Sequence, residues 1–211
     1  MENLKNYKIN YFKEAYYKEI ERNEMLSNGF NYPASIIPVL IGVIIAFLID
    51  TMPINVSCNN ISTIIFLAFL GLGSLFLIAG IYYLYKFQTH FEYYYLQNSD
   101  LIRDYLDGLE SHYSNLKPIK REKKVIEDME TYLLEEFIKC SNKNAENNDT
   151  KSYYLLLTKR FIGATLSLMF LGSIPYFFIK NINGDVKRVE IVNQKLKINL
   201  VPEEINAHKE Q

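Results

Sequence analysis

The stretch from Ile61 to Tyr85, ISTIIFLAFLGLGSLFLIAGIYYLY, decides the fold class of this chain of 211 residues. It contains no charged residue. A helix of about 20 apolar residues crosses a hydrocarbon core of ~30 Å. A buried helix of a water-soluble domain would carry a polar stripe at helical period, and this stretch carries none. The sequence therefore predicts a transmembrane helix here, in an all-α membrane protein.

A second uncharged block, ASIIPVLIGVIIAFLI, runs from Ala34 to Ile49. A signal peptide is the competing interpretation. Against it, the block follows about thirty residues rich in both Lys and Glu, and no small-residue cleavage site follows. We therefore predict a transmembrane hairpin over residues 30–86, with spans at about 32–50 and 61–85 and a turn over 51–60.

The third block, FIGATLSLMFLGSIPYFFI, covers Phe161 to Ile179 and just reaches spanning length. We predict a third transmembrane helix over 159–180. A re-entrant or interfacial helix is the alternative, although an interfacial helix would carry a charged face. Small residues in the blocks are expected to allow close helix packing. They are Gly71, Gly73, Gly163, Ser167 and Gly172.

Basic residues predict the orientation. The turn over 51–60 has no Lys or Arg, whereas the segments on the outer sides of the hairpin are rich in both. The positive-inside rule then places the N-terminus of this multi-pass membrane protein in the cytoplasm. If the third block spans, the tail over 181–211, predicted to be short and irregular, lies outside. Tyrosines beside the second and third blocks are typical of a membrane interface.

Two segments outside the blocks have helical periodicity. Residues 1–29 are predicted to form an amphipathic cytoplasmic helix, which either lies on the inner leaflet or packs against the other cytoplasmic part. Residues 87–158 are predicted to form a cytoplasmic helical hairpin that turns near Pro118. Its stretch SNKNAENNDT, over 141–150, is interpreted as a linker or a helix N-terminal boundary. The apolar face of the first helix is expected to comprise Leu4, Tyr7, Tyr11, Ala15, Tyr16 and Ile20.

A basic cluster falls at the turn of that hairpin. It is either a solvated turn or a contact for a partner, and it would meet anionic lipid only if the hairpin lies flat on the membrane. The cluster comprises Lys117, Lys120, Arg121, Lys123 and Lys124.

Reactive motifs are missing from the sequence. It has no P-loop, dinucleotide fingerprint, HExxH or nucleophile elbow, and its two cysteines and three histidines lack metal-ligand spacing. The net charge of -1 gives no reason to expect nucleic-acid binding. We therefore predict no catalytic residue, no cofactor and no metal site, and we expect a protein that is not an enzyme.

Two stretches carry a resemblance to a family. One is YKEIERNEMLSN at 17–28, followed by Tyr32-Pro33; the other runs from Tyr132 to Cys140, through KSYYL at 151–155, to Ile174-Pro175-Tyr176. This pattern resembles a group of small uncharacterised bacterial membrane proteins with the same order of parts, which implies a location in the bacterial inner (plasma) membrane. The layout is also similar to that of two-span anti-phage effectors, which implies oligomers that permeabilise the inner membrane.

Two functions remain open from the sequence. The first is a non-enzymatic, membrane-anchored interaction or structural protein, whose partners are the lipid bilayer and either a second copy or another protein held through the cytoplasmic helices. The alternative is an oligomeric pore-forming effector in bacterial defence. Such a pore would be lined by Ser62, Thr63, Ser74 or Thr165.

Overall fold

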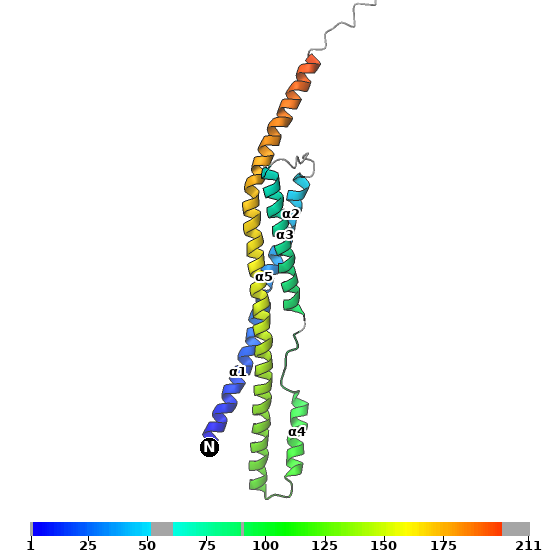
Figure 1. Ribbon diagram of the computed structural model, residues 1–211. Helices are drawn as coiled ribbons and strands as arrows, with labels where there is room; N and C mark the ends of the chain where they lie inside the picture. Colours follow the sequence, from blue (N-terminus) through cyan, green and yellow to red (C-terminus); the bar gives the residue numbers. More distant parts are fainter. Residues whose placement is uncertain (1, 52–60, 90, 200–211) are drawn as a thin grey trace, which may run out of the picture. The chain divides into compact units, whose positions relative to one another are not determined.

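The computed structural model describes residues 2–51, 61–89 and 91–199, with side chains for 4–51, 61–89 and 91–180. The described chain is helical and contains no strand (Figure 1). The predicted turn over 52–60 and residues 200–211 lie outside the described residues. The helices are α1 (Glu2–Gly29), α2 (Asn31–Thr51), α3 (Ile61–Gln88), α4 (Ser99–His112) and α5 (Pro118–Asn199).

Three helical stretches are long and apolar enough to cross a membrane, as the sequence predicts. They are Leu4–Thr51, Ile61–Gln88 and Pro118–Lys180. The all-α fold class is therefore confirmed, together with the helical nature of the three apolar blocks.

The chain divides into two compact units. Unit 1 comprises Met1–Ile36 and Ala79–Arg160, and unit 2 comprises Ile37–Ile78 and Phe161–Gln211. The third apolar block thus belongs to the same unit as the apolar residues of the hairpin.

In unit 2, α5 packs antiparallel to α3. Phe161 contacts Phe76, with ring centroids 5.9 Å apart, and Tyr176 contacts Phe66 at 5.6 Å. Phe47 of α2 joins the same aromatic group, because its ring lies 5.0 Å from that of Tyr176. The third block therefore runs alongside the second over most of its length, which is the packing expected of a full spanning helix.

The structure corrects the predicted shape of the segment over 87–158. Helix α3 ends at Gln88, and residues 91–98 are not helical, so the first arm is the shorter α4. The second arm is not interrupted by a linker, because α5 is one helix of 82 residues that includes Ser141 to Thr150. Asparagine is only a weak helix former, but here its side chains are used for tertiary hydrogen bonds that offset the low propensity.

The predicted irregular tail is also wrong over its first part. Helix α5 continues to Asn199. Between Pro175 and Pro202 the sequence has no proline, and it is rich in Val, Ile, Leu and Lys. A single glycine, Gly184, costs about 1 kcal/mol in a helix and does not end it.

Candidate functional site

A row of polar side chains on α5 forms the best-defined cluster in unit 1. Asn144, Asn147, Asn148 and Lys151, named here the polar seam, follow one another at spacings of three, one and three residues. Counted from Asn144, they lie at i, i+3, i+4 and i+7, and such positions share one face of a helix. Asn144 and Asn148 are fully buried, and Lys151 is 9% exposed.

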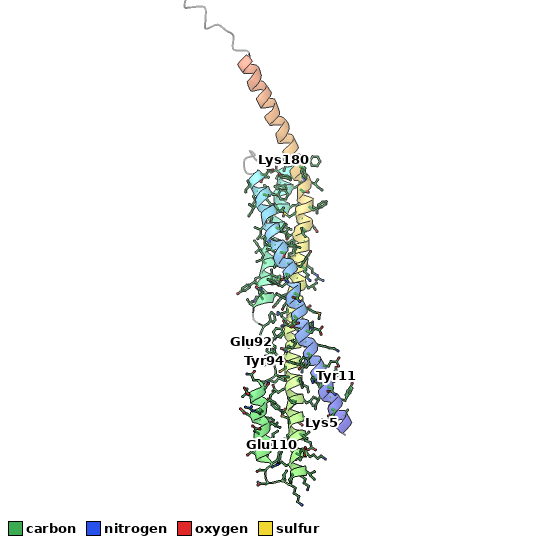
Figure 2. The ribbon with its side chains drawn as sticks, turned by 180° about the vertical axis from the view of Figure 1, so that it is seen from behind. Lys5, Tyr11, Glu92, Tyr94, Glu110 and Lys180 are labelled. Carbon is green, nitrogen blue, oxygen red and sulfur yellow. The ribbon has the colours of Figure 1, made fainter. Side chains whose placement is uncertain are left out.

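Asn144 holds the non-helical segment 91–98. Its amide oxygen accepts a bond of 2.9 Å from the backbone N–H of Tyr94, and its Nδ2 donates one of 2.8 Å to the Tyr94 carbonyl. Asn147 Nδ2 donates to the carbonyl of Glu92 at 2.7 Å. Figure 2 labels Glu92 and Tyr94 in this segment beside α5. The side-chain amides thereby satisfy backbone groups for which this segment has no helix or sheet partner.

Asn148 links three elements of unit 1. Its Nδ2 donates to the carbonyl oxygen of Glu19, at 2.7 Å, and to the Glu19 carboxylate, at 2.8 Å. Its Oδ1 accepts a bond of 2.5 Å from the Tyr93 hydroxyl. Burial raises the pKa of Tyr93 to about 12, so this hydroxyl keeps its proton at neutral pH and remains a donor.

Lys151 is enclosed by aromatic rings. Its Nζ lies 5.2 Å from the ring centre of Phe87, 5.7 Å from that of Phe91 and 5.1 Å from that of Tyr93. It donates one hydrogen bond of 2.9 Å, to Asn23 Oδ1 on α1. Burial lowers the pKa of this ammonium group. Among the described residues no carboxylate forms an ion pair with it, so the rings and the amide provide its stabilisation.

The edge of the seam carries an exposed ion pair. Arg22 donates to Asp149 Oδ1 at 2.6 Å and also lies 3.5 Å from Glu19 Oε2. The bond to Asp149 raises the pKa of Arg22, which stays charged throughout the physiological range. Every buried side-chain nitrogen and oxygen of the described part has a hydrogen-bond partner. This satisfied network is suited to fixing α1 and segment 91–98 on α5.

The thiol beside the seam is not activated for nucleophilic chemistry. Cys140, next to the seam, is buried, and burial raises the pKa of its thiol, which disfavours the thiolate needed for nucleophilic chemistry. The described residues contain no group of three His, Cys, Asp or Glu side chains that could hold a metal ion.

The apolar face predicted for α1 is wrong at its first three residues. Leu4, Tyr7 and Tyr11 are exposed, and Figure 2 shows Tyr11 on the side of α1 that faces away from α5. Of the predicted set, Tyr16 is buried, at 5.8 Å from the ring of Phe137, and Ile20 packs against the same cluster. The remaining contacts are made by Phe12, Leu96, Leu133 and Cys140. Within unit 1, α1 therefore packs against α5, which agrees with the second of the two interpretations of this helix.

The predicted basic cluster lies at the start of α5. Lys124 is bonded to Glu127 at 2.8 Å, whereas no ion pair with a described residue is found for the other four members. Next to the cluster, an open groove of about 900 Å³ has Ile119 and Ile126 among its lining residues. Its other lining residues are Lys5, Glu122, Lys123, Glu127, Asp128, Glu130 and Thr131.

The five small residues predicted for helix packing divide into two groups. Gly73 and Gly172 are buried in unit 2, where a Cβ would meet Met169 and Phe69, respectively. Gly71 and Gly163 are exposed, with nothing within 4 Å of an added Cβ, and Ser167 is exposed as well. Only the first pair therefore serves close packing within the chain.

Of the four hydroxyl side chains predicted to line a pore, two are buried within the chain and Ser62 is half-buried. Thr63 and Thr165 are buried in unit 2, and the Thr165 hydroxyl donates to the carbonyl oxygens of Phe161 and Gly73, at 3.0 and 3.3 Å. Ser74 donates to the Leu70 carbonyl at 2.8 Å. The bonds of Thr165 and Ser74 lie within one chain, and the pore hypothesis stays a prediction.

Sequence reasoning missed a polar cluster in unit 2. The carboxylate of Asp50, at the end of α2, accepts hydrogen bonds from the Tyr176 hydroxyl and from Lys180 Nζ, the latter at 3.1 Å. The sequence does contain a signal for this cluster, because Asp50 and Lys180 each directly follow an apolar block. Opposite charges at the ends of parallel spans would be expected to meet.

No protein-family model, curated protein or solved structure matches this chain.

Proposed function

We propose that the protein is a non-enzymatic, membrane-anchored interaction protein, in which unit 2 is the anchor and unit 1 is the cytoplasmic part that pairs with a second copy. The positive-inside pattern supports a cytoplasmic unit 1 in the bacterial inner membrane.

The apolar outer surface of unit 2 carries the anchoring part of the proposal. A water-soluble bundle exposes polar side chains, whereas the exposed side chains of this unit are mostly aliphatic or aromatic. Apolar surface of this extent is stable in contact with lipid rather than water. The large exposed members include Val39, Ile45, Ile64, Leu67, Leu75, Leu166, Phe170, Ile174 and Phe177.

The polar seam supports a role in presentation rather than in catalysis. Its amides and its ammonium group bond to backbone and side chains of the same unit, so they are not free to act on a substrate. They fix α1 on α5, and this places Lys5 beside the start of α5, where its Nζ lies 3.1 Å from Glu130. The seam thereby supports one wall of the groove.

The groove is the surface for which we propose the second copy. Ile119 is 85% exposed and Ile126 is 50% exposed, although both are large aliphatic residues. Lys123 and Glu122 flank them, so that the same patch carries both signs of charge. A two-fold interface brings a patch against its own copy, and this requires self-complementary charge. Pairing of two copies would cover both isoleucines.

Two measurements test this function. Alkaline carbonate extraction of membranes should leave the protein in the membrane fraction. Light scattering of the detergent-purified full chain should give more than one copy, and Ile126→Glu should reduce it to one copy, because a carboxylate would be buried at the interface. Asn142→Glu, at an exposed polar position of the same helix, is the matched control and should not change the mass.

A strictly monomeric wild-type protein that recovers no partner in pull-downs would overturn the interaction role. An assembled Ile126→Glu variant would show that copies meet elsewhere. Recovery of a different protein by the wild type and not by Ile126→Glu would assign the groove to that protein instead of a second copy.

A further inference from the structure

Tyrosines and cations gather on α3 and α5 of unit 1, beside the uncharged segments. We define this set as the girdle. The ring contacts Tyr82–Tyr83, Tyr83–Tyr154 and Tyr153–Tyr154, at 5.3, 6.2 and 6.0 Å, join the two helices into one aromatic surface. The girdle comprises Tyr82, Tyr85, Lys86, Tyr153, Lys159 and Arg160.

The cations of the girdle, like four members of the basic cluster, differ from the paired cations of unit 1. Lys5, Lys18, Arg22, Lys124, Lys139 and Lys143 each pair with a carboxylate in unit 1. For Lys86, Lys159 and Arg160 no ion pair with a described residue is found; Lys86 instead lies over the ring of Tyr82, at 5.8 Å. Lys159 and Arg160 are exposed. The girdle is therefore a positively charged surface without an internal counter-charge.

The chemistry of the girdle matches a phospholipid headgroup. Tyrosine is favoured at the membrane–water interface, where its ring is buried and its hydroxyl stays wet, and Tyr82, Tyr85 and Tyr153 are all more than half exposed. Arginine binds phosphate in a bidentate manner, and lysine binds it as a point charge. Exposed Ile81 and Leu156 lie beside these groups in unit 1, and Arg160 directly precedes the apolar block that begins at Phe161.

From these observations we infer that the girdle binds the phosphate groups of anionic phospholipids. The inference rests on the membrane anchoring proposed above and names the lipid class that the anchor selects. It also places the contact with anionic lipid at the girdle instead of at the basic cluster near Pro118. Lys120 and Arg160 are roughly 40 residues apart on the continuous helix α5, which is ~60 Å along its axis and far beyond a Debye length.

The test uses the full-length protein in phosphatidylcholine vesicles that contain spin-labelled lipid. The fraction of immobilised label gives the association of phosphatidylglycerol with the protein relative to that of phosphatidylcholine. We expect the wild type to prefer phosphatidylglycerol by roughly fivefold, the size of one surface cation's attraction to an anionic membrane. The combined variant Lys86→Gln, Lys159→Gln and Arg160→Gln should lower this ratio to near one.

The matched control is Lys117→Gln, Lys120→Gln and Arg121→Gln, which removes the same numbers of lysines and arginines from the basic cluster and should keep the ratio. Equal association of the two lipids with the wild type overturns the inference, as does a preference that survives in the girdle variant. A preference lost only in the control would assign lipid binding to the basic cluster.

Two further measurements distinguish a variant that fails to accumulate from a failed inference, and a failed lipid preference from a failed membrane anchor. If the girdle variant does not accumulate, the wild type is measured in low and high salt; screening should reduce the ratio for exposed cations, and a salt-independent ratio overturns the inference. Wild-type protein released by carbonate would refute the anchoring itself. Protein that resists carbonate but shows no lipid preference would refute the lipid inference alone.

Discussion

Replacement of Lys151 by methionine tests the central contact of the polar seam. Methionine keeps the length and the apolar stem of lysine but removes the ammonium group. Three ring contacts at about 0.5–1 kcal/mol each would be lost, together with a charged hydrogen bond worth about 1.5–3 kcal/mol. Because the variant no longer buries a charge, it also avoids the free-energy cost of desolvating the ammonium group, and this offsets part of the loss. We expect a net loss of about 2–3 kcal/mol from unit 1.

The assay is hydrogen exchange of the full-length protein in lipid nanodiscs, followed by mass spectrometry. Peptides that cover Glu19 to Asn23 and segment 91–98 should exchange roughly 30 to 150 times faster in Lys151→Met, since 1.4 kcal/mol corresponds to a factor of ten. Lys143→Met is the matched control: Lys143 lies on the same helix, is exposed, and bonds only to Glu146. The control should exchange like the wild type.

The pH dependence gives the prediction a second readout. Burial lowers the folded-state pKa of Lys151 below its usual 10.5, so the unfolded state binds more protons between the two values. The stability of wild-type unit 1 should therefore rise with pH in that window, and Lys151→Met should lack this rise. Above pH 10 the opposite contribution begins, because the folded-state pKa of Tyr93 is about 12, so its proton is lost first from the unfolded state.

A Lys151→Met variant with equal or slower exchange than the wild type would refute this reasoning. The free-energy cost of burying the ammonium group would then exceed the stabilisation that the rings and Asn23 provide. The same balance is found where buried ion pairs are replaced by apolar side chains without loss of stability.

Three further predictions follow from other parts of the structure. Asn144→Leu leaves the N–H and carbonyl of Tyr94 unpaired and should speed exchange of segment 91–98 by about tenfold or more, whereas Asn142→Leu should not; equal effects would contradict the assigned bonds. Gly172→Leu should cost unit 2 about 1–3 kcal/mol by overpacking, measured as a lower melting temperature in detergent, and Gly163→Leu should be tolerated. A reporter fused after Lys180 should be active only on the side of the membrane opposite unit 1; activity on the same side would refute a third crossing.

The sequence by itself determined that the chain is helical and that three of its segments suit a membrane. This succeeded because the signal is local: the absence of charge over about 20 residues can be read without knowledge of any partner. The break between two helices near Pro118 was equally readable, since proline is tolerated in the first turn of a helix but not in its interior.

Only the tertiary structure decided the meaning of the asparagine-rich stretch over 141–150. Taken alone, these residues favour a turn or a linker, because their side chains compete for backbone hydrogen bonds. In unit 1, Asn144 and Asn148 instead bond to segment 91–98 and to α1, to residues 50 and 129 positions away in the chain. No local pattern can reveal a hydrogen-bond partner at that separation.

The two apolar faces of α1 illustrate the same limit. Leu4, Tyr7 and Tyr11 are as apolar as Phe12 and Tyr16, and periodicity cannot tell which set meets α5. The structure selects the face of Tyr16 because this face also brings Lys5 to Glu130, and Glu19 and Asn23 to the polar seam. Buried polar groups must find partners, so they fix the rotation of a helix where apolar contacts alone would allow more than one.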